Sequence, residues 1–275
     1  MVTIDDVRSL VRSRLPRADV EAVTLLGEGM DNVAFAVDDL VVRFAREPSA
    51  EAVHREARVL EVAGRVSPVP VPAPVLVVPE LGCLAYRRLP GVPLLELRHR
   101  VEPGPVAAAL ADLLAALHAV PAADVDDVLT ADDEPPSVWL EELTADQVPP
   151  RYRPAVAAFL ATPAPPPGGL AVFSHDDLGI EHVLVDPDSG AVTGVIDWTD
   201  AGLVDPAGDP GRVLRDLGPA ALDTVLGRLD PGLRDRAWFY ARCGAIEDLA
   251  YGVQNARSAY VDKAVDSMAW LFAGD

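Results

Sequence analysis

The chain has 275 residues, half of them hydrophobic, and its formal net charge is −20. This length allows two modest hydrophobic cores, and the negative charge argues against nucleic acid as a partner while favouring a cationic small molecule. Because the sequence shows no long apolar span, no basic leader and only two distant cysteines, Cys83 and Cys243, we expect a cytoplasmic protein with no membrane partner.

Turn formers and β-branched runs near the N-terminus predict a small antiparallel sheet. Its strands are expected at Thr24–Leu26, Val33–Val37 and Leu40–Phe44. A glycine-bearing turn at residues 27–32 connects the first two strands, and a two-residue turn of aspartates connects the next two. Pairing Val37 with Leu40 therefore places Arg43 opposite Ala34, beside the glycine-bearing turn.

A helix is predicted at Ser49–Ala63, with an apolar stripe formed by Val53, Ala57, Leu60 and Gly64. Glu56 flanks this stripe rather than lying opposite it, which indicates a partner on the sheet, and Arg43 fits that slot. The alternative is that Glu56 lies on a solvated helix edge and that Arg43 is an ordinary charge at a strand end.

A further strand is predicted at Leu84–Leu89, just before Pro90, where we place a domain boundary. The boundary divides the chain into residues 1–90 and 91–275. An apolar helix follows at Val106–Val120, and its C-terminal end is expected to favour the charged form of His118. Farther along, Val138–Asp146 is expected to be a helix without a motif.

Residues 173–198 predict a hairpin, because two runs rich in Val, Leu, Ile and Thr flank a cluster of turn formers at 187–190. If Asp186 pairs with Ala191, His182 lies opposite Val195. Asp197 is then a diagonal neighbour of His182 on the same face, roughly 7 to 8 Å away between Cα atoms. Asp177 precedes the hairpin and is expected to point toward the same end.

These three residues suit phosphoryl transfer, which needs a carboxylate to orient or accept a proton and cations to neutralise phosphates. Asp177, His182 and Asp197 could supply those parts. The structural alternative is that Asp177 caps a turn, that His182 begins a strand and that Asp197 ends one.

The order of the residues resembles a known family. His175-x-Asp177-Leu178, a possible metal ligand five places after Asp177, and Val-Ile-Asp-Trp at 195–198 are similar to the catalytic loop and metal-binding segment of the aminoglycoside phosphotransferase family. This family is a branch of the protein-kinase-like fold. The resemblance implies an α+β, bilobal fold with a small antiparallel β-sheet N-lobe and a mainly helical C-lobe. It also implies that Asp177 is the catalytic base and that Asp197, with His182, holds Mg²⁺.

The resemblance implies further roles. ATP or GTP would be held by Gly27, Gly29, Asn32, Arg43 steadied by Glu56, and the interlobe connection at Arg88 and Leu89. The turns Asp205-Pro206 and Asp209-Pro210 both resemble an Asp-Pro turn that usually supports the catalytic loop in the family. The acceptor would be met in the C-terminal half, where the candidates are Asp200, Glu247, Asp248 and Tyr251. Each has a structural alternative, since helix acids are usually solvated and aromatic residues at helical spacing are usually core.

The chain departs from the family pattern at three positions. Asp176 stands where the family usually has Gly, His182 where it has Asn, and Arg43 where it commonly has Lys. Some macrolide-phosphorylating members also carry His at the second position. Since Mg²⁺ favours oxygen ligands and guanidinium is not interchangeable with ammonium, we expect altered metal and phosphate contacts.

The expected activity is that of a small-molecule kinase, a monomer or dimer, which transfers the γ-phosphate to a hydroxyl of an aminoglycoside or macrolide and so contributes to antibiotic resistance. Alternatives are a kinase of a metabolic alcohol or amino sugar and a catalytically weak nucleotide-binding module. The doublet His175-Asp176 also occurs in metal-dependent HD phosphohydrolases, but those place it on helices, whereas strands flank it here.

Overall fold

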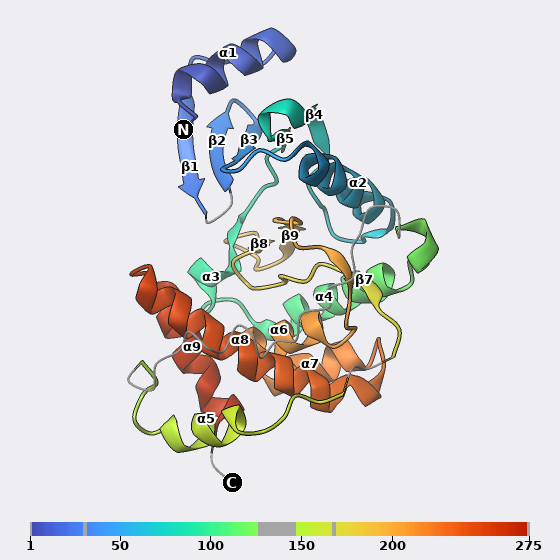
Figure 1. Ribbon diagram of the computed structural model, residues 1–275, viewed down its shortest axis with the longest axis vertical. Coiled ribbons are helices and arrows are strands. Elements are labelled where there is room, and N and C mark those ends of the chain that lie inside the picture. The colour runs from blue at the N-terminus through green and yellow to red at the C-terminus, as the bar shows by residue number, and fades with distance from the viewer. Residues whose placement is uncertain (1, 30–31, 126–146, 167–168, 274–275) are drawn as a thin grey trace.

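The computed structural model describes residues 2–29, 32–125, 147–166 and 169–273. The helix expected at Val138–Asp146 and positions 30 and 31 of the glycine-bearing turn lie outside these ranges. The chain forms an N-terminal lobe around an antiparallel sheet and a mainly helical C-terminal lobe (Figure 1). This is the α+β, bilobal architecture expected from the sequence. Within the described ranges, every helix is too short or too polar to span a bilayer.

The N-terminal sheet has five antiparallel strands in the order β1-β2-β3-β5-β4. The strands are β1 (Val23–Glu28), β2 (Asn32–Val37), β3 (Leu40–Ala45), β4 (Pro74–Val78) and β5 (Cys83–Arg87). The two-residue turn between β2 and β3 produces the predicted register, with Val37 opposite Leu40 and Ala34 opposite Arg43. The side chain of Arg43 therefore starts from the middle strand of the sheet.

Two helices accompany this sheet. α1 (Ile4–Arg14) begins with a capping box between Thr3 and Asp6 and contacts β1. α2 (Ala50–Val66) begins after Ser49, whose hydroxyl accepts the backbone N–H of Ala52. The inward face of α2 is apolar except for Glu56, which is only 8% exposed. A carboxylate buried to this extent requires a partner on the sheet.

The C-terminal lobe is a bundle in which α8 lies against both α6 and α9 (Figure 1). Its helices are α3 (Leu94–Leu97), α4 (Pro103–His118), α5 (Arg153–Leu160), α6 (Gly208–Leu217), α7 (Pro219–Leu226), α8 (Arg234–Gln254) and α9 (Ser258–Leu271). Leu214, Ile246 and Met268 are among the buried residues that bring α6, α8 and α9 together. The helix predicted at Val106–Val120 corresponds to α4.

One hydrophobic core extends across the two lobes. Leu60 of α2 and Leu84 of β5 belong to the same buried cluster as Leu113 of α4 and Phe173 of the short strand β7 (Val172–Ser174). Apolar packing therefore fixes how the sheet sits on the helical lobe, and with it the distance between functional side chains on either side.

Short strands between the lobes carry the loop of interest. β7 (Val172–Ser174) pairs with β10 (Gly202–Val204), and β6 (Val92–Pro93), β8 (Val183–Val185) and β9 (Val192–Val195) form a three-stranded sheet. The hairpin expected at residues 182–197 is β8 and β9, and the register predicted for it is wrong by one residue. Val183, not His182, lies opposite Val195, because Thr193 is an extra residue that bulges out of β9.

The bulge changes how Asp197 approaches His182. The backbone N–H of Ile196 donates to the carbonyl oxygen of His182 at 2.9 Å, so these two residues are aligned. Asp197 then leaves the strand with a φ of 62°, in the left-handed region. The two side chains meet through this backbone turn rather than as diagonal neighbours in a regular ladder.

Candidate active site

The loop between β7 and β8, residues 175–182, is held by one buried carboxylate. Asp209, at the start of α6, accepts a hydrogen bond from Ser174 Oγ at 2.7 Å. It also accepts the backbone N–H groups of His175, Asp176 and Leu178 at 2.9, 3.1 and 3.3 Å. Burial alone would raise the pKa of Asp209, but Arg212, His175 and these hydrogen bonds outweigh it and lower the pKa. Asp209 thus fixes the backbone on both sides of Asp177.

Asp176 adopts a conformation that favours glycine. Its φ is 63°, which explains physically why glycine suits this position. The Asp176 carboxylate accepts a hydrogen bond from Arg212 Nη1 at 3.2 Å, and Arg212 Nε lies 3.7 Å from Asp177 Oδ1. The sequence analysis did not identify Arg212. Its position three residues after Asp209 on a helix could have indicated that the two side chains are neighbours.

Two histidines near this loop are structural. His175 Nδ1 accepts the backbone N–H of Asp177 at 3.2 Å, and its Nε2 lies 3.0 Å from the carbonyl oxygen of Ile196. With both ring nitrogens engaged, His175 has no free nitrogen for a metal in this arrangement. Burial lowers the pKa of His175, whose ring also packs 4.6 Å from the buried ring of Trp198. Burial lowers the pKa of His118 as well, so the expectation that it favours the charged form is wrong.

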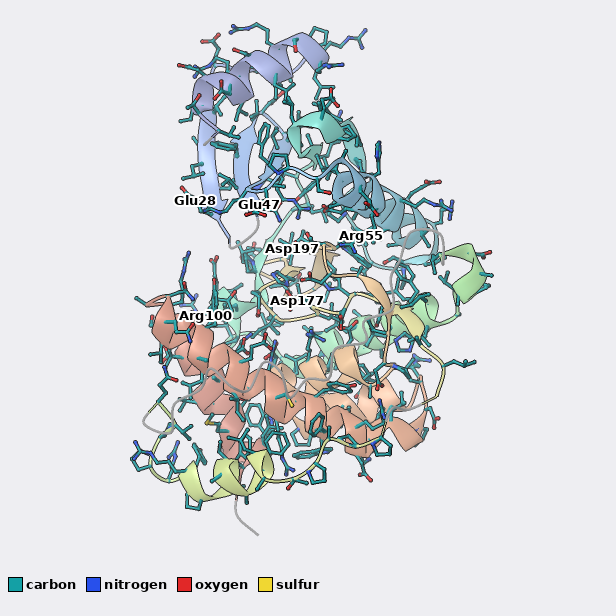
Figure 2. The ribbon with its side chains drawn as sticks, in the orientation of Figure 1. Glu28, Glu47, Arg55, Arg100, Asp177 and Asp197 are labelled. Atoms are coloured by element: carbon teal, nitrogen blue, oxygen red, sulfur yellow. The ribbon has the colours of Figure 1, made fainter. Side chains whose placement is uncertain are left out.

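Asp177, His182 and Asp197 converge. His182 Nδ1 lies 2.9 Å from the carbonyl oxygen of Asp177 and 3.3 Å from its Oδ2, and His182 Nε2 lies 3.8 Å from Asp197 Oδ2. Burial alone would lower the pKa of His182, but Asp177, Glu181 and Asp197 outweigh it and raise the pKa. Both aspartates stay partly exposed, at 36% and 44% of their side chains. They lie between the N-terminal sheet and the helical lobe (Figure 2).

Arg43 of β3 contacts residues in both lobes. Arg43 pairs with Glu56 of α2 in a buried contact, and its Nη1 donates to Asp197 Oδ1 at 3.1 Å. Burial raises the pKa of Glu56, which its proximity to Arg43 partly offsets. A second link comes from α2, where Arg55 Nη2 donates to the carbonyl oxygen of Thr199 at 3.3 Å. The guanidinium of Arg43 therefore joins the N-terminal sheet to the predicted metal ligand.

The glycine-bearing turn lies at the end of β1 and β2. The N–H of Gly29 donates to the carbonyl oxygen of Asn32 at 2.8 Å, and a Cβ added at Gly27 would meet only open space. Arg46, which the sequence analysis missed, donates to the carbonyl oxygen of Gly29 at 3.0 Å and to Glu28 at 2.8 Å. Glu28 and Glu47 lie at this end of the sheet, above Asp197 (Figure 2).

The interlobe connection is ordered by backbone and packing contacts. The N–H of Arg88 donates to the carbonyl oxygen of Asp39 at 2.8 Å, and the Leu89 side chain lies so close to Gly194 that a Cβ there would approach within 2.6 Å. Gly91 has a φ of 101°, and a Cβ on it would lie 2.4 Å from Thr193 Oγ1. Glycine is required at Gly91, where an added Cβ would also lie 2.6 Å from the carbonyl oxygen of Val185.

The acceptor candidates fall into two groups. Asp200 and Glu247 are exposed, and Tyr251 is partly exposed with its ring centroid 4.9 Å from that of Tyr260. Asp248 is different, because it is 7% exposed and its Oδ2 lies 3.0 Å from Lys263 Nζ. The structure assigns Asp248 to an internal charge cluster and not to an open substrate surface.

The chain is similar in sequence and in fold to known phosphotransferases. The model of a family described as "Phosphotransferase enzyme family" matches residues 22–242. None of the curated proteins matches the chain. Among solved structures, the GDP complex of wild-type aminoglycoside 2'-phosphotransferase-IIIa is similar with a TM-score of 0.74 and 20% identity over 99% of each chain.

Two further solved structures widen the comparison. Macrolide 2'-phosphotransferase MphH from Brachybacterium faecium has a TM-score of 0.67 and 24% identity, covering 96% of this chain and 97% of that one. A choline/ethanolamine kinase family protein from Mesorhizobium loti has a TM-score of 0.61 and 19% identity, covering 97% and 95%. At these identities the similarity shows a shared fold along nearly the full length of each chain.

Proposed function

Because the chain belongs to the phosphotransferase enzyme family, and is a small-molecule phosphotransferase acting on hydroxyl groups, we propose that it moves the γ-phosphate of ATP or GTP to an antibiotic-like acceptor, an aminoglycoside or a macrolide. The observation that carries the proposal is the convergence of Asp177, His182 and Asp197 beneath Arg43. We assign nucleotide binding to residues 1–90 and acceptor binding to residues 91–275. We propose that the reaction takes place in the cytoplasm, where nucleoside triphosphates are available.

In the proposed reaction, Asp177 orients the acceptor hydroxyl and takes its proton on a carboxylate oxygen. The hydroxyl oxygen forms a bond to the γ-phosphorus, the bond to the bridging oxygen breaks, and the nucleoside diphosphate leaves with that electron pair. Arg212 Nε lies 3.7 Å from Asp177 Oδ1, so its guanidinium helps to orient the carboxylate. Asp177 is partly exposed, so an acceptor can reach it.

Asp197 and His182 are the residues that would hold Mg²⁺. The carboxylate of Asp197 is the principal donor of this pair, because Mg²⁺ usually takes one or two carboxylates and completes its shell with water and phosphate oxygens. When bound there, the ion would neutralise the phosphate charge. The oxygen of Asp197 suits it better than the imidazole of His182, which lies within reach of two carboxylates and is driven toward its charged form.

The choice of acceptor is supported from two sides. His182 stands where some macrolide-phosphorylating relatives also carry histidine, and the exposed acids Asp200 and Glu247 suit a cationic amino sugar. The similarity to a choline/ethanolamine kinase family protein favours a metabolic amino alcohol as the second candidate. A catalytically weak module is less favoured, since Asp177 and Asp197 are both present and partly exposed.

The test is mass spectrometry of aminoglycoside, macrolide and amino alcohol panels after incubation with Mg²⁺ and either ATP or GTP. We expect a product heavier by one phosphate, and Asp177→Asn should reduce kcat by about 10²- to 10⁴-fold with nucleotide affinity nearly unchanged. Asp188→Asn, in the exposed turn of the same hairpin, is the matched control and should behave as wild type. Near-normal turnover by Asp177→Asn would overturn the assignment of the base. Nucleotide binding without transfer to any acceptor would instead favour the weak module.

A further inference from the structure

The second half of the catalytic loop is anchored to the last helix. Glu181, immediately before His182, accepts two hydrogen bonds from Lys263 Nζ of α9, at 3.0 Å and 2.7 Å. Lys263 is buried and Glu181 is largely shielded from solvent, with exposed side-chain fractions of 2% and 12%. The carboxylate folds back over Gly179, where an added Cβ would lie 2.6 Å from Glu181 Oε1. Gly179 thus provides the space that Glu181 needs to point at Lys263.

Lys263 is also the centre of a larger charge cluster. Its Nζ lies 3.0 Å from Asp248 and 3.8 Å from Asp216, and Arg215 pairs with the same two carboxylates. Asp216 in turn accepts the backbone N–H of Ile180 at 3.0 Å. Two contacts to the loop, one to the Ile180 backbone and one to the Glu181 side chain, therefore converge on one ammonium group.

The far side of this charge cluster borders a cavity rather than tightly packed side chains. A cavity of about 480 Å³ lies there, lined in part by Lys263, Asp216, Leu94 and Trp270. The backbone N–H of Leu95 in α3 donates to the carbonyl oxygen of Ile180 at 3.1 Å, so α3 also contacts the loop. Without the ammonium group, three carboxylates (Glu181, Asp216 and Asp248) would face a single arginine, and Glu181 would lose its partner on α9.

The two halves of the loop are held by different parts of the chain. Asp209, which holds the first half, lies within residues 22–242, which match the family model. Lys263, which holds the second half, lies beyond that range. We infer that Lys263 is a positioning residue for phosphoryl transfer, which acts through Glu181 to set the orientation of His182. The kinetic part of this inference rests on the proposed function.

The kinetic test uses an acceptor that the wild type phosphorylates. Lys263→Met and Glu181→Gln should each lower kcat by about 10- to 100-fold, with KM for the nucleotide changed less than about twofold. Lys263→Arg should restore most of the rate, since the cavity can accept the larger guanidinium. The double variant should be no slower than the slower single variant, because both changes remove one interaction. Additive losses in the double variant would contradict action through Glu181.

A control separates positioning from general destabilisation. Met268→Ala removes a fully buried side chain from the same helix without touching the cluster, so its kcat per folded molecule should stay at the wild-type value. An equal fall in kcat for Met268→Ala would overturn the inference. Glu181→Gln leaves Lys263 with two other carboxylates and carries the test if Lys263→Met is recovered unfolded.

Amide hydrogen exchange tests the inference without any turnover. Lys263→Met or Glu181→Gln should speed exchange in the peptide covering residues 177–183, whereas Met268→Ala should leave that peptide as protected as the wild type. Unchanged protection in both cluster variants would refute the inference. If the wild type phosphorylates no acceptor, the proposed function fails, and the exchange result still decides whether Lys263 holds the loop.

Discussion

Replacing Asp209 by asparagine isolates the charge that holds the catalytic loop. Asparagine keeps one acceptor oxygen for the three donors that share Oδ2, but it puts an NH₂ group where Oδ1 now accepts the N–H of Leu178. Three charge-assisted bonds become neutral, at about 1 kcal/mol each, and one buried N–H loses its acceptor, at about 1–3 kcal/mol. We expect a loss of about 4 to 6 kcal/mol in unfolding free energy at pH 7.

The pH dependence follows from the sign of the shift. The pKa of Asp209 is lowered in the folded state, so the stability it contributes is fully present above the unfolded pKa of about 3.9 and is lost as pH falls through the folded value. Wild type and Asp209→Asn should therefore differ equally at pH 5 and pH 7. The difference should shrink by about 1 kcal/mol at pH 3.

Urea denaturation followed by circular dichroism measures both effects, with Asp188→Asn as the exposed control. A difference below about 1 kcal/mol at pH 7 would show that the four donors do not depend on the carboxylate charge. A difference that is the same at pH 3 and pH 7 would show that the charge of Asp209 is not the stabilising feature.

Three further outcomes can be measured. Arg43→Lys should tighten Mg²⁺ binding about fivefold in the presence of nucleotide, as measured by calorimetry, because the guanidinium 3.1 Å from Asp197 no longer competes with the ion for that carboxylate. Unchanged or weaker binding would count against this competition. Gly91→Ala should lower the unfolding free energy by more than about 2 kcal/mol in urea, because its Cβ would meet Thr193 in a left-handed backbone, and a neutral result would be inconsistent with that geometry. Burial raises the pKa of Asp248 to about 7, so the unfolding free energy of the wild type should fall as pH rises from about 4 to about 7. Asp248→Asn should remove that fall, and a variant with the same pH profile as the wild type would exclude Asp248 as its cause.

The fold and the central site residues could be predicted where local rules decide the geometry. The two-residue turn after Val37 sets the register of the N-terminal hairpin, so Ala34 was correctly predicted to lie opposite Arg43. Glu56 was found because a carboxylate on an apolar helix face needs a partner, and Arg43 is that partner. The roles of these residues in binding nucleotide remain predictions.

The errors arise where distant segments decide. Nothing in the turn after Asp186 indicates a bulge at Thr193, so the register of β8 and β9 came out one residue off. Asp248 reads as a helix acid because its partner Lys263 lies on another helix, and Arg212 reads as a surface charge because its partners lie in the loop. Helix periodicity reports which face is apolar and says little about which charges meet across helices.

Trp198 gives the protein an internal optical reporter. Its ring is 1% exposed, its Nε1 donates to the carbonyl oxygen of Val195 at 3.0 Å, and it follows Asp197 directly in the chain. The neighbouring imidazole of His175 has a lowered pKa and therefore stays neutral near physiological pH, when it does not quench as an imidazolium would. The chain has four tryptophans, so the emission of Trp198 is obtained as the difference between wild type and Trp198→Phe. Its fluorescence thus follows events at Asp197 in real time, without a dye or a coupled assay.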